Sequence, residues 1–287
     1  MNSTRKERYF SWIFLLPSLI GVMVFFVIPF IYSFYYALID NLGSRNFVGL
    51  SNFIETLTND LFLRASRNTL VFVAISVPIG MAIALFLASG LRNMQRGKAL
   101  VAVALLLPLV VPSGATAYFW QIIFGVNGLF NRIMIMFGAD HSTLLRDQWT
   151  MGFLVVIYLW KNISFNIILF WSGLNWIPNT YYEQMKVDGV NAWNRFLHIT
   201  LVYLLPTTLV VLLISIVNSF RVFREIQMLF GSYPSIDIYM LQHYLNNQFL
   251  AMNMAKVSSA AYIMIIALGL VLFGVYRAQK RVTDLFY

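Results

Sequence analysis

Residues 183–206 read EQMKVDGVNAWNRFLHITLVYLLP, and this stretch decides how the chain is organised. Its first half is polar and charged, whereas long apolar runs lie on both sides of it. Within a membrane-embedded chain, a polar segment between two apolar runs is typical of a surface that contacts a soluble partner.

The composition of the whole chain places it among membrane proteins. Hydrophobic residues make up 60% of the 287 positions and charged residues only 11%, against about 25% charged residues in an ordinary soluble domain. The chain has no cysteine, so disulfides and Cys-ligated metals are excluded. No long polar block interrupts the apolar runs, and we therefore expect a single transmembrane domain over 1–287.

Six apolar stretches are long enough to cross the membrane as helices, which takes about 20 residues each. The sequence therefore predicts an all-α polytopic membrane protein. The predicted spans are residues 12–39, 68–91, 99–124, 151–176, 203–224 and 257–276.

The distribution of cations predicts how these spans are oriented. An even number of spans leaves both termini on one side. The short segments on that side, including residues 183–206, carry 11 Lys and Arg residues, and the longer loops on the other side carry six. By the positive-inside rule, we expect both termini and the 183–206 segment to be cytoplasmic.

Within the cytoplasmic segment, Gly189 separates two stretches that favour short helices, residues 182–187 and 192–198. Glycine permits the sharp change of backbone direction that such an elbow needs. The alternative is an amphipathic loop lying on the bilayer surface. If the segment docks on a partner, the contacting residues are Glu183, Lys186, Asp188, Gly189, Trp193 and Phe196, with Met185 and Leu197 beside them.

The same segment resembles the cytoplasmic signature of ABC importer permeases, in which an acidic residue and a glycine precede nine residues and an Ile-x-Leu end. The matching residues are Glu183, Asp188, Gly189, Ile199 and Leu201, whereas Gln184, Met185 and Val202 depart from the pattern. Residues 106–124, 170–189 and 223–234 are similar to stretches of the sugar-type branch, particularly the larger maltose-system permease class in a minimal six-span form.

The resemblance implies a type I ABC importer permease fold and a carbohydrate substrate, most simply an oligosaccharide. It implies that residues 183–206 are the coupling segment that docks on an ATPase. It also implies four further partners: a second permease subunit, two ABC ATPase subunits and an extracytoplasmic solute-binding protein. The expected location is a bacterial or archaeal cell membrane.

The chain itself lacks the phosphate-binding motif GxxxxGK[ST]. Its one Gly-Lys pair, Gly97-Lys98, is followed by Ala99 and has no glycine at the required upstream spacing. We therefore expect a non-catalytic permease subunit without a cofactor, and ATP and Mg²⁺ bound by the partner ATPase subunits.

A candidate substrate site surrounds Lys161, which lies about ten residues into the fourth predicted span and so near the bilayer midplane. A cation at this depth usually faces a cavity or a partner. Trp160, Asn162 and Asn166 offer an aromatic face and amide donors suited to a sugar. The alternative is a polar contact between helices.

The resemblance adds Ser113, Ser215 and Ser219, which align with positions that line the sugar cavity of the family. Arg221 and Arg224 lie near the outer end of the fifth predicted span. Three interpretations stay open for these arginines: attraction of an anionic substrate, pairing with Glu225, and snorkelling to water.

We find no pattern typical of a catalytic or metal site. The three histidines, His141, His198 and His243, lack the H-E-x-x-H spacing. The alternative function is a stand-alone channel or an ion-coupled secondary carrier, which predicts acidic residues inside the spans. None of the six predicted spans contains Asp or Glu, which disfavours the carrier.

Overall fold

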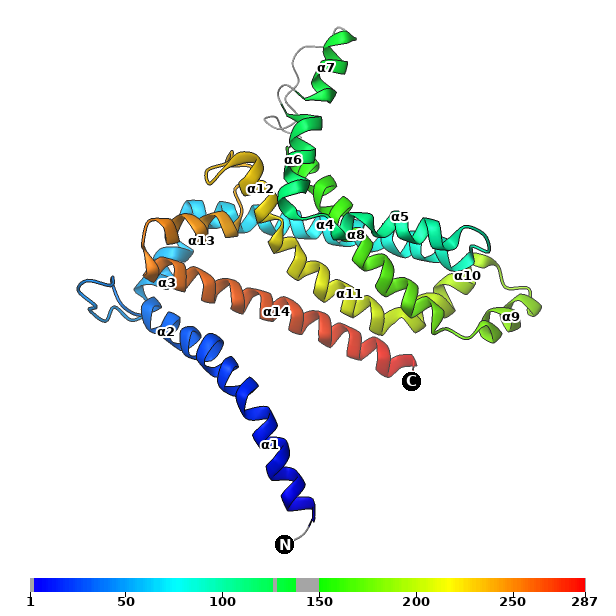
Figure 1. The fold of residues 1–287 in the computed structure, drawn as a ribbon, viewed down its shortest axis with the longest axis horizontal. Helices are drawn as coiled ribbons and strands as arrows, with labels where there is room; N and C mark the ends of the chain where they lie inside the picture. The colour runs from blue at the N-terminus through cyan, green and yellow to red at the C-terminus, as the bar shows by residue number, and fades with distance from the viewer. Residues whose placement is uncertain (1–2, 126–127, 138–149, 287) are drawn as a thin grey trace. The chain divides into compact units, whose positions relative to one another are not determined.

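The computed structural model of the chain describes residues 3–125, 128–137 and 150–286, and within them it is built almost wholly of helices (Figure 1). The one β pairing in these ranges is an isolated bridge between Ile39 and Phe47. The chain divides into two compact units, Met1–Leu63 with Leu245–Ala267, and Arg64–Tyr244 with Leu268–Tyr287.

The first unit contains the N-terminal span and the beginning of the last helix. Its helices are α1 (Ser3–Val22), the π-helical η1 (Met23–Val27), α2 (Ile28–Ala37), α3 (Ser51–Leu57) and the first part of α14 (Met254–Phe286). The buried Asn52 donates hydrogen bonds to the carbonyls of Ala37 and Ile39, at 3.0 and 2.8 Å, and so closes the end of α2. Thr56 and Ser259 form a buried hydroxyl pair, 2.9 Å apart, that ties α3 to α14.

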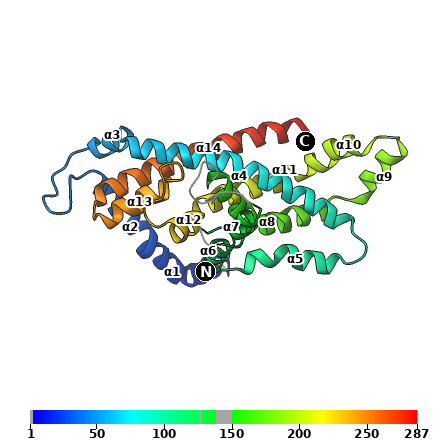
Figure 2. The same ribbon diagram turned by 90° about the horizontal axis from the view of Figure 1, so that it is seen from above.

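The second unit contains both candidate sites. Its helices are α4 (Asp60–Asn93, in this unit from Arg64), α5 (Lys98–Val110), α6 (Ser113–Phe124), α7 (Leu129–Met136), α8 (Thr150–Asn175), α9 (Asn179–Val187), α10 (Ala192–Arg195), the π-helical η2 (Phe196–Thr200), α11 (Leu201–Arg221) and α12 (Phe223–Phe230). Helix α13 (Leu241–Leu250) begins in this unit and ends in the first, and the last part of α14, from Leu268, also belongs here. Helix α8 packs against both α5 and α11, and Figure 2 shows it between them.

In the described part of the chain, five helical stretches are able to cross a membrane by length and composition: Phe14–Ala37, Asp60–Asn93, Thr150–Asn175, Ala192–Phe230 and Met254–Arg277. Helix α5 and the stretch that begins with α6 form a bent pair. Counting this pair as one broken span gives a sixth span. These helices agree with a polytopic membrane protein.

The stretch 99–124, which the sequence predicted as one span, is two helices that meet at an angle of 98°. The break follows Val110, where Val111 is extended at φ −73° and ψ 122°. The residue before a proline avoids the helical region because its backbone clashes with the proline ring, and Pro112 follows directly. Ser113, at the start of α6, therefore lies at a corner of the backbone and not inside a straight helix.

The fifth span is longer than residues 203–224. Helices α10, η2 and α11 run without a break from Ala192 into the span, so the second short helix expected over 192–198 is the start of the span itself. At its other end the apolar stretch continues through α12 to Phe230.

Helices α8 and α11 of the second unit approach each other closely at Gly173. A Cβ built on Gly173 of α8 would lie 2.6 Å from Thr207 Oγ1 and 2.9 Å from Leu204 Cδ2 of α11. Small residues allow helix backbones in membranes to approach in this way. The buried cluster around Phe170, Leu174 and Leu204 surrounds this crossing.

Candidate functional site

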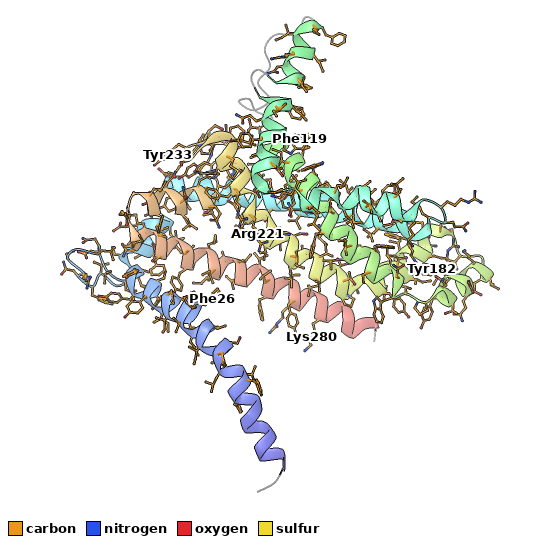
Figure 3. All side chains as sticks on the ribbon, in the orientation of Figure 1. Phe26, Phe119, Tyr182, Arg221, Tyr233 and Lys280 are labelled. Atoms are coloured by element: carbon orange, nitrogen blue, oxygen red, sulfur yellow. The ribbon has the colours of Figure 1, made fainter. Side chains whose placement is uncertain are left out.

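A cavity of about 560 Å³ lies between α8 and α11 and is closed at one side by α12. Tyr158, Lys161, Asn162 and Phe165 share one face of α8 because they are spaced three or four residues apart. Helices α11 and α12 and the residue between them face this side with Leu213, Ile214, Val217, Asn218, Arg221, Val222, Arg224 and Glu225, and Leu109, Ser113 and Ile157 complete the lining. Figure 3 shows Arg221 at the end of α11.

Lys161 is held by two partners from different helices. Its Nζ donates to Ser113 Oγ at the start of α6 and to Glu225 Oε1 on α12. The Glu225 side chain is only 3% exposed and that of Lys161 21% exposed. A buried carboxylate needs such a cation, because an unpaired charge in this environment costs several kcal/mol.

Sequence analysis considered Glu225 only as a partner of Arg221 and Arg224 and missed its pairing with Lys161. The predicted span ended at residue 224, whereas the apolar stretch runs to Phe230 and contains Glu225. The argument that the spans hold no acidic residue therefore has an exception. This acid is paired with Lys161, so its presence is accounted for by an ion pair within the chain.

Of the predicted substrate residues, Ser113, Lys161 and Asn162 line the cavity. Asn162 Nδ2 donates to the carbonyl of Tyr158 in its own helix, at 3.0 Å. Their role as substrate ligands stays a prediction.

The other predicted substrate residues lie outside the cavity lining. Asn166 donates to Ser215 Oγ at 3.0 Å, and both side chains are buried between α8 and α11. Ser219 is also buried, and its hydroxyl donates to the carbonyl of Ile216 at 2.6 Å. Trp160 stacks on Phe119 with the ring centroids 5.8 Å apart. In these positions, Asn166 and Ser215 form the polar contact between helices that was the alternative interpretation.

The predicted coupling segment forms an elbow at Gly189. Helix α9 ends at Val187, and Gly189 has a positive φ of 71°. The amide of Val190 donates back to the carbonyl of Met185 at 2.9 Å, as in a Schellman turn. Asn191 then caps the next helix by accepting from the amide of Asn194 at 2.8 Å.

Arg92 holds the elbow against the spans, a role that the sequence did not reveal. From the last turn of α4, its guanidinium donates to the carbonyl of Ile177 at 3.1 Å, to Asn179 Oδ1 at 2.9 Å and to the Tyr182 hydroxyl at 3.2 Å. The Tyr182 hydroxyl lies 2.9 Å from Thr200 Oγ1 of η2. Helix α9 is thus connected to both α4 and the base of the fifth span.

The charged residues of the elbow are exposed. The side chains of Glu183, Lys186 and Asp188 make no hydrogen bond or ion pair with any part of the chain that the structure describes. Two large apolar side chains are exposed beside them, Val187 at 88% and Trp193 at 65%. Trp193 stacks on Phe196 at 5.8 Å, whereas Met185, expected at the partner surface, packs on the buried cluster.

The coupling elbow and the cavity are separate sites in the same unit. Figure 3 shows Tyr182 on α9 and Arg221 on α11 apart along the bundle. Of the three histidines, His243 is buried, His198 is exposed, and His141 lies outside the described residues. Within the described ranges, no group of three His, Asp or Glu side chains is placed to hold a metal ion.

A bundle of membrane-length helices with a polar cavity between spans and an exposed elbow at one end defines a membrane permease. The chain belongs to the family described as "Binding-protein-dependent transport system inner membrane component", whose pattern matches residues 70–283. The resemblance found in the sequence is therefore confirmed.

The chain is similar to the arabinooligosaccharides transport system permease protein AraP of Bacillus subtilis (strain 168). The identity is 32% over 278 residues, which cover 93% of this chain and 87% of AraP. It is also similar to a chain of a bacterial ABC transporter involved in the import of the acidic polysaccharide alginate, with a TM-score of 0.84, 21% identity and 97% of both chains covered. The chain is also similar to a second structure, a bacterial alginate ABC transporter in complex with an alginate pentasaccharide-bound periplasmic protein. The TM-score is 0.83 and the identity 21%, with 97% of this chain and 96% of that chain covered. The predicted all-α ABC importer permease fold is confirmed.

Proposed function

We propose that this chain is the transmembrane permease subunit of an ATP-driven importer for an oligosaccharide or related carbohydrate. Family membership supports the transport role. The names of AraP and of the alginate transporter support a carbohydrate as the substrate. The cavity agrees, because it combines amide groups with apolar side chains that suit the hydroxyls and the CH face of a sugar.

The coupling elbow is the observation that carries the proposal. It presents unpaired charges and exposed apolar side chains, a combination suited to a protein partner. It is fixed to two spans through Arg92, Tyr182 and Thr200, so a force on the elbow is transmitted to them. A stand-alone channel or secondary carrier has no need of such a surface.

The partners of the proposed complex are a second permease subunit, two ABC ATPase subunits and an extracytoplasmic solute-binding protein. The alginate transporter in complex with a periplasmic protein supports the last of these. ATP and Mg²⁺ are bound by the ATPase subunits. Both termini and the elbow face the cytoplasm, on the side of the membrane that carries more Lys and Arg residues.

Transport proceeds by alternating access. Closure of the ATPase dimer on ATP moves the elbow, and the spans pass from an inward-facing to an outward-facing state around the cavity. This coupling requires ATP and substrate each to bind the two states with different affinity.

The test is mass spectrometry of the proteins that co-purify with the tagged chain from its native membrane in mild detergent. We expect an ABC ATPase with the wild type and a large loss of it with Glu183→Ala or Gly189→Val. Glu55→Ala is the matched control, because Glu55 is an exposed glutamate in the first unit. Recovery of the chain alone, or only with itself, contradicts the proposal and favours the channel or carrier.

A further inference from the structure

The cavity between α8 and α11 has an unbalanced charge. Three cations line it, Lys161, Arg221 and Arg224, and the one acid among the lining residues is Glu225. Glu225 is bound to Lys161, and this ion pair neutralises both. Two guanidinium groups are therefore left without a counter-charge in the wall of the cavity.

Pairing with Glu225 does not explain the two arginines, since that carboxylate is taken by Lys161. Within the described residues, neither the Arg221 nor the Arg224 side chain makes a hydrogen bond or an ion pair. Both arginines are exposed and both line the cavity, so the water that they reach by snorkelling is the water of the cavity. They are three residues apart and so lie on the same side of the chain, where α11 passes into α12.

Guanidinium groups are suited to one kind of ligand group. Each presents a planar fork of N–H donors that matches the two oxygens of a carboxylate or phosphate. Two like charges in one cavity wall repel each other, and an anion bound to both offsets that repulsion. The arginines therefore make this part of the cavity suited to an anion.

We propose that the substrate is an anionic carbohydrate, whose carboxylate or phosphate group binds to Arg221 and Arg224. The sugar ring then lies toward Phe165 and Val217, and the amides of Asn162 and Asn218 hydrogen-bond its hydroxyls. This inference rests on the proposed function and adds the charge of the substrate to it. Lys161 stays paired with Glu225 and orients the wall of the cavity.

The test measures thermal unfolding of the complete transporter complex, purified from its native membrane and placed in lipid nanodiscs. Three probes are compared: trigalacturonate, which carries carboxylates, glucose 6-phosphate, which carries a phosphate, and neutral maltotriose. We expect at least one anion to raise the unfolding midpoint, and the rise to shrink between about 20 and about 300 mM salt because of screening. Maltotriose leaves the midpoint unchanged, and the two anions distinguish a uronate from a sugar phosphate.

Variants assign the effect to the cavity. Arg221→Gln and Arg224→Gln each weaken the apparent affinity for the anion about tenfold or more, since each removes a charge-assisted contact. Arg221→Lys keeps the charge and loses the fork, so its affinity lies between those of the wild type and Arg221→Gln. Arg67→Gln is the matched control, because Arg67 is an exposed cation of α4 that does not line the cavity.

Three results overturn the proposal: an equal shift with maltotriose, no shift with either anion, or an anion shift that persists in the arginine variants. Loss of the second permease subunit from the Arg221→Gln complex also overturns it, because the arginines then serve the subunit interface. The ATPase subunits are scored in the same preparation. Their absence contradicts the proposed function, so the two failures are distinguishable.

Discussion

At the residue scale, Lys161 and its two partners connect three helices. Lys161 comes from α8, Glu225 from α12, and Ser113, the second partner of Lys161, from the start of α6. Each of these helices continues in a different direction (Figure 1). The pair therefore fixes the corner at which the cavity is formed.

Lys161→Met leaves a buried carboxylate without its cation, so we expect a loss of about 3 kcal/mol or more in the free energy of unfolding. The double variant Lys161→Met with Glu225→Met removes both charges, and we expect it to be close to the wild type. Denaturant unfolding of the purified protein measures both. A double variant as unstable as the single one shows that the pair is not the source of the effect.

His243 is a second residue with a measurable consequence. It is fully buried against Phe223 and Tyr239, at ring distances of 4.8 and 5.5 Å, and its Nδ1 accepts from the amide of Met240. Burial lowers the pKa of His243 from 6.5 to about 4. The unfolded chain therefore binds a proton between these pH values that the folded chain does not bind.

Stability consequently falls as the pH is lowered through this window, by about 2 kcal/mol between about pH 7 and about pH 5. The measurement is the free energy of unfolding at several pH values. In His243→Asn, the side-chain oxygen is able to accept from the Met240 amide and does not titrate, so we expect a flatter profile. Identical slopes for the two proteins contradict the prediction.

At the residue scale, the sequence identified Lys161 as a charged residue deep in a span, but it did not show which of the polar residues near it line the cavity. Lys161 was identified from its depth in an apolar run, a signal that needs no tertiary structure. The pairing of Glu225 with Lys161 and the contacts of Arg92 were missed because the partners are 64 and 85 to 90 residues away in the chain, and no local pattern marks such contacts. Asn166 and Ser215 look the same in sequence whether they face a ligand or each other.

At the scale of elements, the turn at Gly189 is the feature that the sequence predicted most directly. Its positive φ is a conformation that glycine adopts without cost, whereas most residues lose about 1 to 2 kcal/mol in it. Two helix boundaries elsewhere in the chain were predicted less well. The break at Val111 has a local cause, because Pro112 disfavours the helical region at the residue before it. The extension to Phe230 has no such local signal, and α12 there packs against α6.

We expect Gly189→Val to uncouple transport from ATP hydrolysis, because the elbow no longer docks on the ATPase, while the chain still inserts into the membrane. The reason is backbone strain and not a clash, because a Cβ on Gly189 meets no atom within 4 Å. Gly189→Asn is the matched control, since asparagine tolerates the left-handed conformation. Uptake by complemented cells measures the effect, and normal uptake by the valine variant would contradict it.

At the scale of the molecule, charge and hydropathy predict the orientation, which the fold by itself does not reveal. The chain has no cysteine, so single cysteines report on topology without background. Ser235 and Gln95 are both exposed and lie in loops expected on opposite sides. They form a matched pair of positions.

We expect Ser235→Cys to react with a membrane-impermeant maleimide in cells whose outer surface is accessible. Gln95→Cys reacts only after the membrane is permeabilised, because its loop carries the cytoplasmic excess of cations. Labelling is measured by a mass shift on a gel. The reverse pattern would place the coupling elbow on the outside and contradict the proposed function.

The continuous helix from Ala192 to Arg221 gives the fifth span the properties of a lever arm. Its short end carries the exposed Trp193, and its far end carries a guanidinium of the cavity. With η2 as the pivot, the arm from Thr200 to Arg221 is about 31 Å long, and a tilt of about 10° displaces its tip by about 5 Å. A small rotation at the docking end is thereby converted into a displacement larger than a hydrogen bond, which is enough to release a bound anion.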